Sequence, residues 1–141
     1  MAIDEGDLEL AGEYGFRLAL SGEWAKGCAL VASAKGKLTG PAGYQASVLA
    51  LCAYMSGSNA EALGWIRQAA LSDNPQYHLI ATLVYAQAGM LDDAKREADW
   101  LKANAPQFAA NITEEVRLRL RRPEDREKVM ASLAAAGLGG R

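Results

Sequence analysis

The side chains that most often carry out chemistry are few in this 141-residue sequence. His78 is its only histidine, and its two cysteines, Cys28 and Cys52, stand far apart among apolar neighbours. A single histidine excludes most metal sites and the Ser-His and Cys-His pairs of nucleophilic catalysis. The cysteine spacing matches neither a metal-binding motif nor a disulfide-rich framework, so we interpret both as residues buried on helices. The sequence therefore predicts no metal, no cofactor and no catalytic residue.

Adjacent carboxylates are the remaining candidates for acid–base chemistry. The pairs within the expected helical region are Asp92-Asp93, Glu114-Glu115 and Glu124-Asp125. Each pair lies where a helix is expected to begin, and negative charge there interacts favourably with the positive end of the helix dipole. This structural role is sufficient to explain the pairs, and we predict that the chain is not an enzyme.

A cluster of basic residues near the C-terminus is the one local charge feature. It comprises Arg117, Arg119, Arg121, Arg122, Arg126 and Lys128. Leucines and carboxylates are interspersed with it, as expected of a solvated amphipathic capping helix. It lacks the aromatic residues on which bases stack, so we expect no nucleic-acid partner. A contact with the acidic segment that precedes Arg17, within one chain or across a dimer, is the alternative.

Length and bulk composition fit one compact domain. The formal net charge is −2 and the sequence pI is about 5.4, which gives no basic field toward nucleic acid or an anionic membrane. No apolar run approaches the roughly 18 residues of a membrane span. The first residues are acidic, whereas a signal peptide begins with basic residues followed by an apolar stretch. We therefore expect a cytoplasmic protein that does not bind membranes.

The elements that would position these residues are helices. Alanine and leucine dominate, β-branched residues are scarce, and no stretch alternates apolar and polar residues long enough to indicate a strand. The expected helices are 8–20, 23–36, 41–56, 60–72, 75–88, 91–104, 113–121 and 123–136. The sequence therefore predicts an all-α protein.

Three glycines mark a repeat within this helical pattern. Gly22, Gly57 and Gly89 recur at intervals close to the period of about 34 residues that is typical of helix-hairpin repeats. A glycine after a helix can adopt the left-handed conformation that ends the helix and lets the chain reverse. Ala62 and Ala94 each follow such a glycine by five residues, where a small side chain permits close packing of the facing helix.

Prolines indicate where the next helices begin. Proline is tolerated in the first turn of a helix, and it occurs in the dipeptides Gly40-Pro41, Asn74-Pro75 and Arg122-Pro123. Asn74 is also a competent N-cap. These signals place the starts of the second and third hairpins and of the last helix.

Together these residues resemble the tetratricopeptide repeat family. The resemblance is carried by Tyr85, Gly89, Leu91, Ala94 and Pro106 in the third unit, and by Tyr54, Gly57, Glu61, Ala62, Leu63 and Ala69 in the second. The first unit has Gly27 where the family favours alanine. The segments around 106–108 and 134–138 are similar to C-terminal repeat regions of bacterial adenylate and guanylate cyclases and winged-helix regulators.

The resemblance implies a right-handed α-solenoid of three antiparallel helix pairs followed by C-terminal capping helices. One domain would span 1–141, with repeats at 8–40, 41–74 and 75–108 and the capping helices at 109–141. The first helix of each pair would line a concave groove that binds a peptide or helix. The family's groove positions fall on Glu9, Phe16, Tyr44, Ser47, Leu51, Tyr54, Met55, Gln76, Leu79, Leu83 and Gln87.

The expected groove is apolar. Residues 41–56 and 75–89 contain no lysine or arginine, which argues against an acidic-tail ligand and for an apolar protein segment. That segment could belong to a partner or be the chain's own 113–136 region. We expect a protein-interaction or scaffold module, for example the regulatory part of a bacterial signalling protein, that could also form a homodimer. The alternative is a structural spacer or homodimerisation unit whose groove is filled by its own C-terminal helices.

Overall fold

The computed structural model describes residues 5–37, 43–69 and 73–139, with the side chains of 5–10, 35–37, 43 and 44 left out. Over these ranges the chain is helical and contains no strand, so the all-α prediction is confirmed. The helices are α1 (Glu5–Leu20), α2 (Trp24–Lys37), α3 (Gly43–Ser56), α4 (Asn59–Ala69), α5 (Pro75–Gln87), α6 (Leu91–Asn104), α7 (Pro106–Ala110), α8 (Ile112–Arg119) and α9 (Pro123–Ala135).

Most predicted helix bounds agree with these to within a few residues. The helix predicted over 75–88 begins at Pro75, and the Asn74 side chain caps it by accepting hydrogen bonds from the backbone N–H groups of Gln76 and Tyr77. The sequence did not predict the short helix α7, which begins at Pro106. Pro41 and the end of the helix predicted over 60–72 lie outside the described residues.

Four helix ends share one backbone arrangement. Gly22, Gly57, Gly89 and Gly137 all have positive φ, from 79° at Gly57 to 112° at Gly22. Each glycine N–H donates to the carbonyl three residues back, and the next N–H donates to the carbonyl five residues back. This pair of bonds is the Schellman motif, which satisfies carbonyls that the helix end leaves open. The three repeat glycines therefore sit at equivalent bends.

In the first hairpin, α1 and α2 pack so closely that no side chain larger than that of glycine fits at positions 15 and 27. A Cβ on Gly27 would lie 2.3 Å from the backbone oxygen of Gly15, and one on Gly15 would lie 2.7 Å from the oxygen of Gly27. The backbones of α1 and α2 therefore approach directly at these two glycines. This contact gives a physical reason for Gly27, at the position where Ala62 and Ala94 are buried in the other hairpins.

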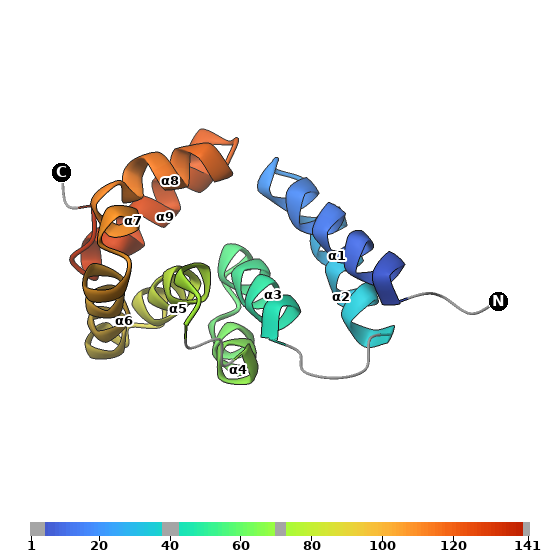
Figure 1. Cartoon of the computed structure of the whole chain (residues 1–141), viewed down its shortest axis with the longest axis horizontal. Helices are drawn as coiled ribbons and strands as arrows, with labels where there is room; N and C mark the ends of the chain where they lie inside the picture. The colour runs from blue at the N-terminus through green and yellow to red at the C-terminus, as the bar shows by residue number, and fades with distance from the viewer. Residues whose placement is uncertain (1–4, 38–42, 70–72, 140–141) are drawn as a thin grey trace.

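The helices follow one another in an arc that its last helices close (Figure 1). The pairs α1–α2, α3–α4 and α5–α6 pack within themselves, α2 packs on α3, α4 packs on α5, and α9 returns to pack on α5. Backbone N–H of Arg121 donates to the carbonyl of Leu20 at 3.1 Å, and the indole N–H of Trp24 donates to Asp125 Oδ2 at 2.9 Å. The turn between α8 and α9 is thus bonded to the first hairpin.

Central helices in this arrangement are buried nearly all round. In α5 every residue from 78 to 84 is buried, and in α3 the same holds for residues 46–51. A helix covered on several sides is expected to be apolar on all its faces rather than on one stripe. This burial explains why α3 and α5 lack charged side chains.

The length and apolarity of the helices also bear on membranes. Among the described residues, no helix is both long and apolar enough to cross a bilayer.

Candidate functional site

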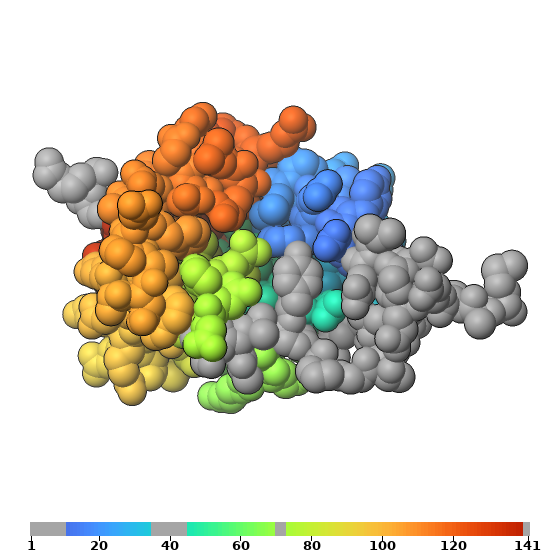
Figure 2. Space-filling model, viewed as in Figure 1, coloured from blue at the N-terminus to red at the C-terminus, as the bar shows by residue number. Residues whose placement is uncertain are grey.

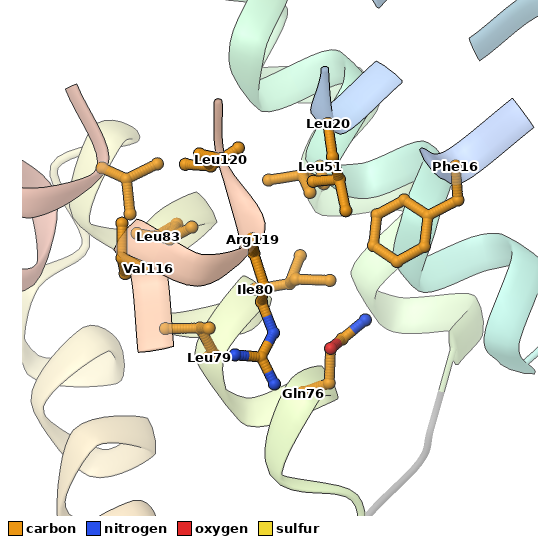
Figure 3. A pocket seen from close by; sticks show the side chains of 11 residues that line it. Phe16, Leu20, Leu51, Gln76, Leu79, Ile80, Leu83, Val116, Arg119 and Leu120 are labelled. Atoms are coloured by element: carbon orange, nitrogen blue, oxygen red, sulfur yellow. The ribbon is translucent and has the colours of Figure 1, made fainter. Parts of the chain in front are cut away.

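The predicted groove positions meet around a small apolar hollow. Its volume is about 40 Å³, which is room for very few water molecules. Figure 3 shows Phe16 and Leu20 on one side and Leu79 and Leu83 on the other, with Leu51 between them. Five of the predicted residues line it: Phe16, Leu51, Gln76, Leu79 and Leu83.

The remaining wall of this hollow comes from the chain's own C-terminal helices. Val116, Arg119 and Leu120 of α8 and Val129 of α9 line it, and the three apolar side chains are buried. In Figure 3 the Arg119 side chain extends from α8 past Ile80 toward Leu79 and Gln76. On this face the C-terminal helices meet the first hairpin directly (Figure 2). The concave face therefore already holds helices of this chain.

Tyr54 fixes α9 in this position. Its side chain is wholly buried, and its hydroxyl donates to the carbonyl of Lys128 at 3.2 Å and shares a hydrogen bond with the Ser132 hydroxyl at 2.6 Å. The Lys128 ammonium lies 4.9 Å from the centre of the Tyr54 ring. Burial raises the pKa of Tyr54 to about 12, opposed by the Ser132 hydrogen bond. Tyr54 is thus occupied by α9 rather than open to a partner.

Gln87, also predicted to bind a partner, instead forms hydrogen bonds within the chain. Its side-chain N–H donates to the backbone oxygen of Tyr54 at 3.1 Å and to Asn59 Oδ1 at 2.7 Å. The Asn59 side chain returns a bond to the Gln87 carbonyl at 3.4 Å. These bonds join the end of α3, the start of α4 and the end of α5.

The other predicted residues are divided. Ser47 lies with Phe16, Asn74 and Gln76 around an open hollow of about 390 Å³, which continues the concave face. Met55 lines a separate cleft instead. The side chains of Glu9 and Tyr44 lie outside the described residues.

No family model, no curated protein and no solved structure matches this chain. The tetratricopeptide resemblance therefore stays a prediction.

The residues of the C-terminal wall were missed at the sequence level, although a signal for them exists. Ile112, Val116 and Leu120 recur every four residues, and Val129 and Leu133 are four apart. This spacing indicates one apolar face on each of two helices, and all five side chains are buried.

His78 is held in a structural contact between α5 and α6. Its ring is buried, Nδ1 lies 2.7 Å from Glu97 Oε1, and the imidazole stacks on Trp100 with ring centres 3.6 Å apart. Within the described ranges, no group of three or more potential metal ligands occurs. His78 therefore joins the third hairpin rather than lining either face of the groove.

Three of the six residues in the basic cluster are paired with nearby carboxylates. Arg117 bonds to Glu114, Arg119 to Glu115 at 2.6 Å, and Arg122 to Glu124 at 2.7 Å. Pairs of this kind at the surface contribute little to stability, and they offset part of the cluster's positive charge. The acidic segment proposed as their alternative partner lies mostly among side chains that are not described.

The interpretation of the two cysteines as separate buried residues is wrong. Cys28 of α2 and Cys52 of α3 form a disulfide with a Cα–Cα distance of 6.0 Å, and both are only half-buried. Their sequence spacing gave no sign of this, because the bond depends on how α2 packs on α3. The disulfide joins the first hairpin covalently to the second.

Proposed function

We propose that this chain is a protein-interaction module of the tetratricopeptide type, a right-handed solenoid of three helix pairs that takes an apolar helix on the face formed by α1, α3 and α5. One observation carries the proposal: this face already accommodates helices, those of the chain's own C-terminal region. Phe16, Leu51, Leu79 and Leu83 supply the apolar surface, as expected for a helix in a groove.

A partner helix would have to compete with α8 and α9. The hollow of about 40 Å³ left between the groove and these helices cannot admit a helix, whose diameter is about 10 Å. The apparent affinity of a partner is then reduced by the fraction of molecules in which the groove is open. Weakening the contacts that hold α9 against the groove should therefore strengthen partner binding.

Leu133→Ala tests this competition in the full chain. Leu133 is wholly buried on α9, and its truncation should destabilise the resident helix by about 2 kcal/mol to 4 kcal/mol. A fluorescent peptide of residues 106–139 serves as the incoming helix, because it retains Leu133. We expect the variant to bind this peptide at least about tenfold more tightly than the unaltered chain does.

Ala131→Gln is the matched control, since Ala131 is exposed on the same helix. A peptide in which Val129 and Leu133 are both serine controls for non-specific binding. Circular dichroism establishes that each variant is folded, and Ser132→Ala provides a milder weakening of the seat. If Leu133→Ala and Ala131→Gln chains are both folded and bind the peptide equally, the competition model is wrong.

The alternative is a structural spacer or homodimerisation unit that binds nothing in its groove. The completed contacts of Tyr54 with α9 favour it, because a groove filled this closely has no need of another occupant. Sedimentation velocity across a concentration range separates the two functions. A dimerising spacer gains mass without any added peptide, whereas the interaction module stays at one mass until the peptide is present.

The proposal assigns no catalytic residue, metal or cofactor, and no nucleic-acid or membrane partner. It retains a cytoplasmic location in a bacterial signalling or regulatory protein as an expectation. The Cys28–Cys52 disulfide bears on that location, because lasting disulfides are characteristic of oxidising compartments. Cell fractionation followed by thiol labelling would show both the compartment and the redox state.

A further inference from the structure

The disulfide lies in a cleft that is separate from the concave groove. This cleft, which we call the tryptophan cleft, has a volume of about 680 Å³. Trp24 and Cys28 of α2, Cys52 of α3 and Trp65 of α4 are among its lining residues. Small-molecule sites typically have volumes of about 300 Å³ to 1,000 Å³ and apolar, aromatic walls. The tryptophan cleft has both properties.

The sulfur-bearing residues can be reached from this cleft. Cys28 and Cys52 are both half-buried, and both line the cleft rather than the closed core. Structural cysteines that are fully buried are inert, whereas exchange requires access for an attacking thiolate. Where disulfides occur in cytosolic proteins of moderate-temperature organisms, they are usually transient.

The polar residues around the cleft carry both signs of charge. Glu61 and Asp125 contribute carboxylates, while Arg122 and Lys128 contribute cations. A ligand whose charges are all of one sign would meet repulsion as well as attraction there. A zwitterionic body can pair with both, and the indole and Met55 side chains offer apolar surface to its neutral part.

We propose that the Cys28–Cys52 disulfide is a thiol-exchange site for a zwitterionic, peptide-like thiol that binds in the tryptophan cleft. The bound thiolate attacks one sulfur, a new S–S bond forms between ligand and protein, and the Cys28–Cys52 bond breaks. The electron pair of that bond stays on the other cysteine, which leaves as a thiolate and takes a proton from solvent. A second thiol releases the ligand as its own disulfide and leaves two reduced cysteines.

Exchange changes how the first hairpin is attached. The disulfide is a covalent link between α2 and α3, and hydrogen bonds from Arg121 and Asp125 to Leu20 and Trp24 hold the same end of that hairpin, with Trp24 one helical turn before Cys28. Once the bond is opened, those hydrogen bonds and the apolar packing remain. The site therefore controls the disulfide attachment between the first and second hairpins.

Glutathione, a tripeptide thiol that carries one ammonium group and two carboxylates, is the probe for this site. The full chain is first oxidised, its disulfide is verified by intact mass, and the native protein is then incubated with a range of glutathione concentrations. We expect mass spectrometry to show one glutathionyl group on Cys28 or Cys52, formed at a rate that saturates with glutathione concentration. A chain that does not form the bond on oxidation overturns the proposal at this first step.

Two variants on α2 decide whether the cleft itself is required. Ala29 is exposed and lines the cleft, so Ala29→Phe fills the cleft without disturbing the core. Ser33 is exposed on the same helix and is not among the lining residues, so Ser33→Phe is the matched control. We expect Ala29→Phe to slow mixed-disulfide formation at least about tenfold and Ser33→Phe to change it less than about twofold.

Equal rates in the two variants would overturn the proposal, because they would show that exchange proceeds without the cleft. A native chain that stays unmodified at glutathione concentrations that fully modify the urea-unfolded chain would overturn it as well. Neither result depends on the peptide-binding experiment, so this site and the groove can fail separately.

Discussion

Removal of one oxygen atom, by Tyr54→Phe, measures how firmly the C-terminal helices close the groove. The Tyr54 hydroxyl bonds to Ser132 at 2.6 Å and to the Lys128 carbonyl at 3.2 Å, inside a wholly buried site. A hydrogen bond contributes about 1 kcal/mol net, and the Lys128 carbonyl keeps its own helical bond. We expect the free energy of unfolding to fall by about 1 kcal/mol and Tm by about 3 °C at pH 8.

The same substitution has a pH dependence whose sign follows from the raised pKa of Tyr54. Because burial raises that pKa from 10.0 to about 12, the unfolded chain loses this proton at lower pH than the native one. The contribution of protonated Tyr54 to the free energy of unfolding is therefore fully present below pH 10, and it is lost as the pH rises toward about 12. Between pH 8 and pH 10.5 the unaltered chain should lose on the order of 1 kcal/mol of stability through Tyr54 alone.

The assay is urea unfolding of the Tyr54→Phe chain and the unaltered chain at both pH values. The stability difference of about 1 kcal/mol at pH 8 should shrink to a few tenths at pH 10.5, because only the unaltered chain carries this proton. Tyr14→Phe is the control, since Tyr14 is 62% exposed and the loss of its hydroxyl should change stability little. If the difference in free energy of unfolding between the Tyr54→Phe chain and the unaltered chain stays constant with pH, the Tyr54 hydroxyl is not buried beneath α9 as described.

Four further variants test individual features of the fold, each by urea or thermal unfolding. Gly89→Ala should lower the free energy of unfolding by about 1 kcal/mol to 2 kcal/mol because Gly89 has a φ of 80°. Gly64→Ala, inside α4, should raise it by about 0.5 kcal/mol to 1 kcal/mol. A Cβ added at either glycine has open space around it, so equal effects would contradict the claim that Gly89 is needed for its positive φ. Asn74→Ala removes the N-cap of α5 and should cost about 1 kcal/mol, unless the cap is redundant. Replacing Cys28 and Cys52 together by serine frees a loop of about 25 residues and should cost about 3 kcal/mol, and reduction of the unaltered chain should match it.

Local signals in the sequence predicted the helices well. Gly57 and Gly89 ended helices because only a residue without a side chain adopts their positive φ at low cost, and Asn74 with Pro75 began one through capping. These effects act over a few residues. The short helix α7 was not predicted, because a proline at position 106 is equally consistent with the end of α6 and with the first turn of another helix.

Long-range packing is what the sequence did not reveal. The absence of lysine and arginine from α3 and α5 was interpreted as preparing the groove for an apolar ligand, but burial of these helices on several sides explains it as well. The place of Tyr54 beneath α9 and the disulfide between Cys28 and Cys52 depend on contacts between helices far apart in the chain. Predicting them requires the tertiary arrangement itself.

The bonds between the α8–α9 turn and the first hairpin also affect how the molecule loses structure. In a linear array each unit touches only its neighbours, so the outer units can unravel while the middle persists. Here Arg121 and Asp125 bond to Leu20 and Trp24, and neither the first hairpin nor the last two helices is a loose outer unit. Amide hydrogen exchange at α2 and α9 should consequently slow to rates close to those of the central helices, with one cooperative opening in place of gradual fraying.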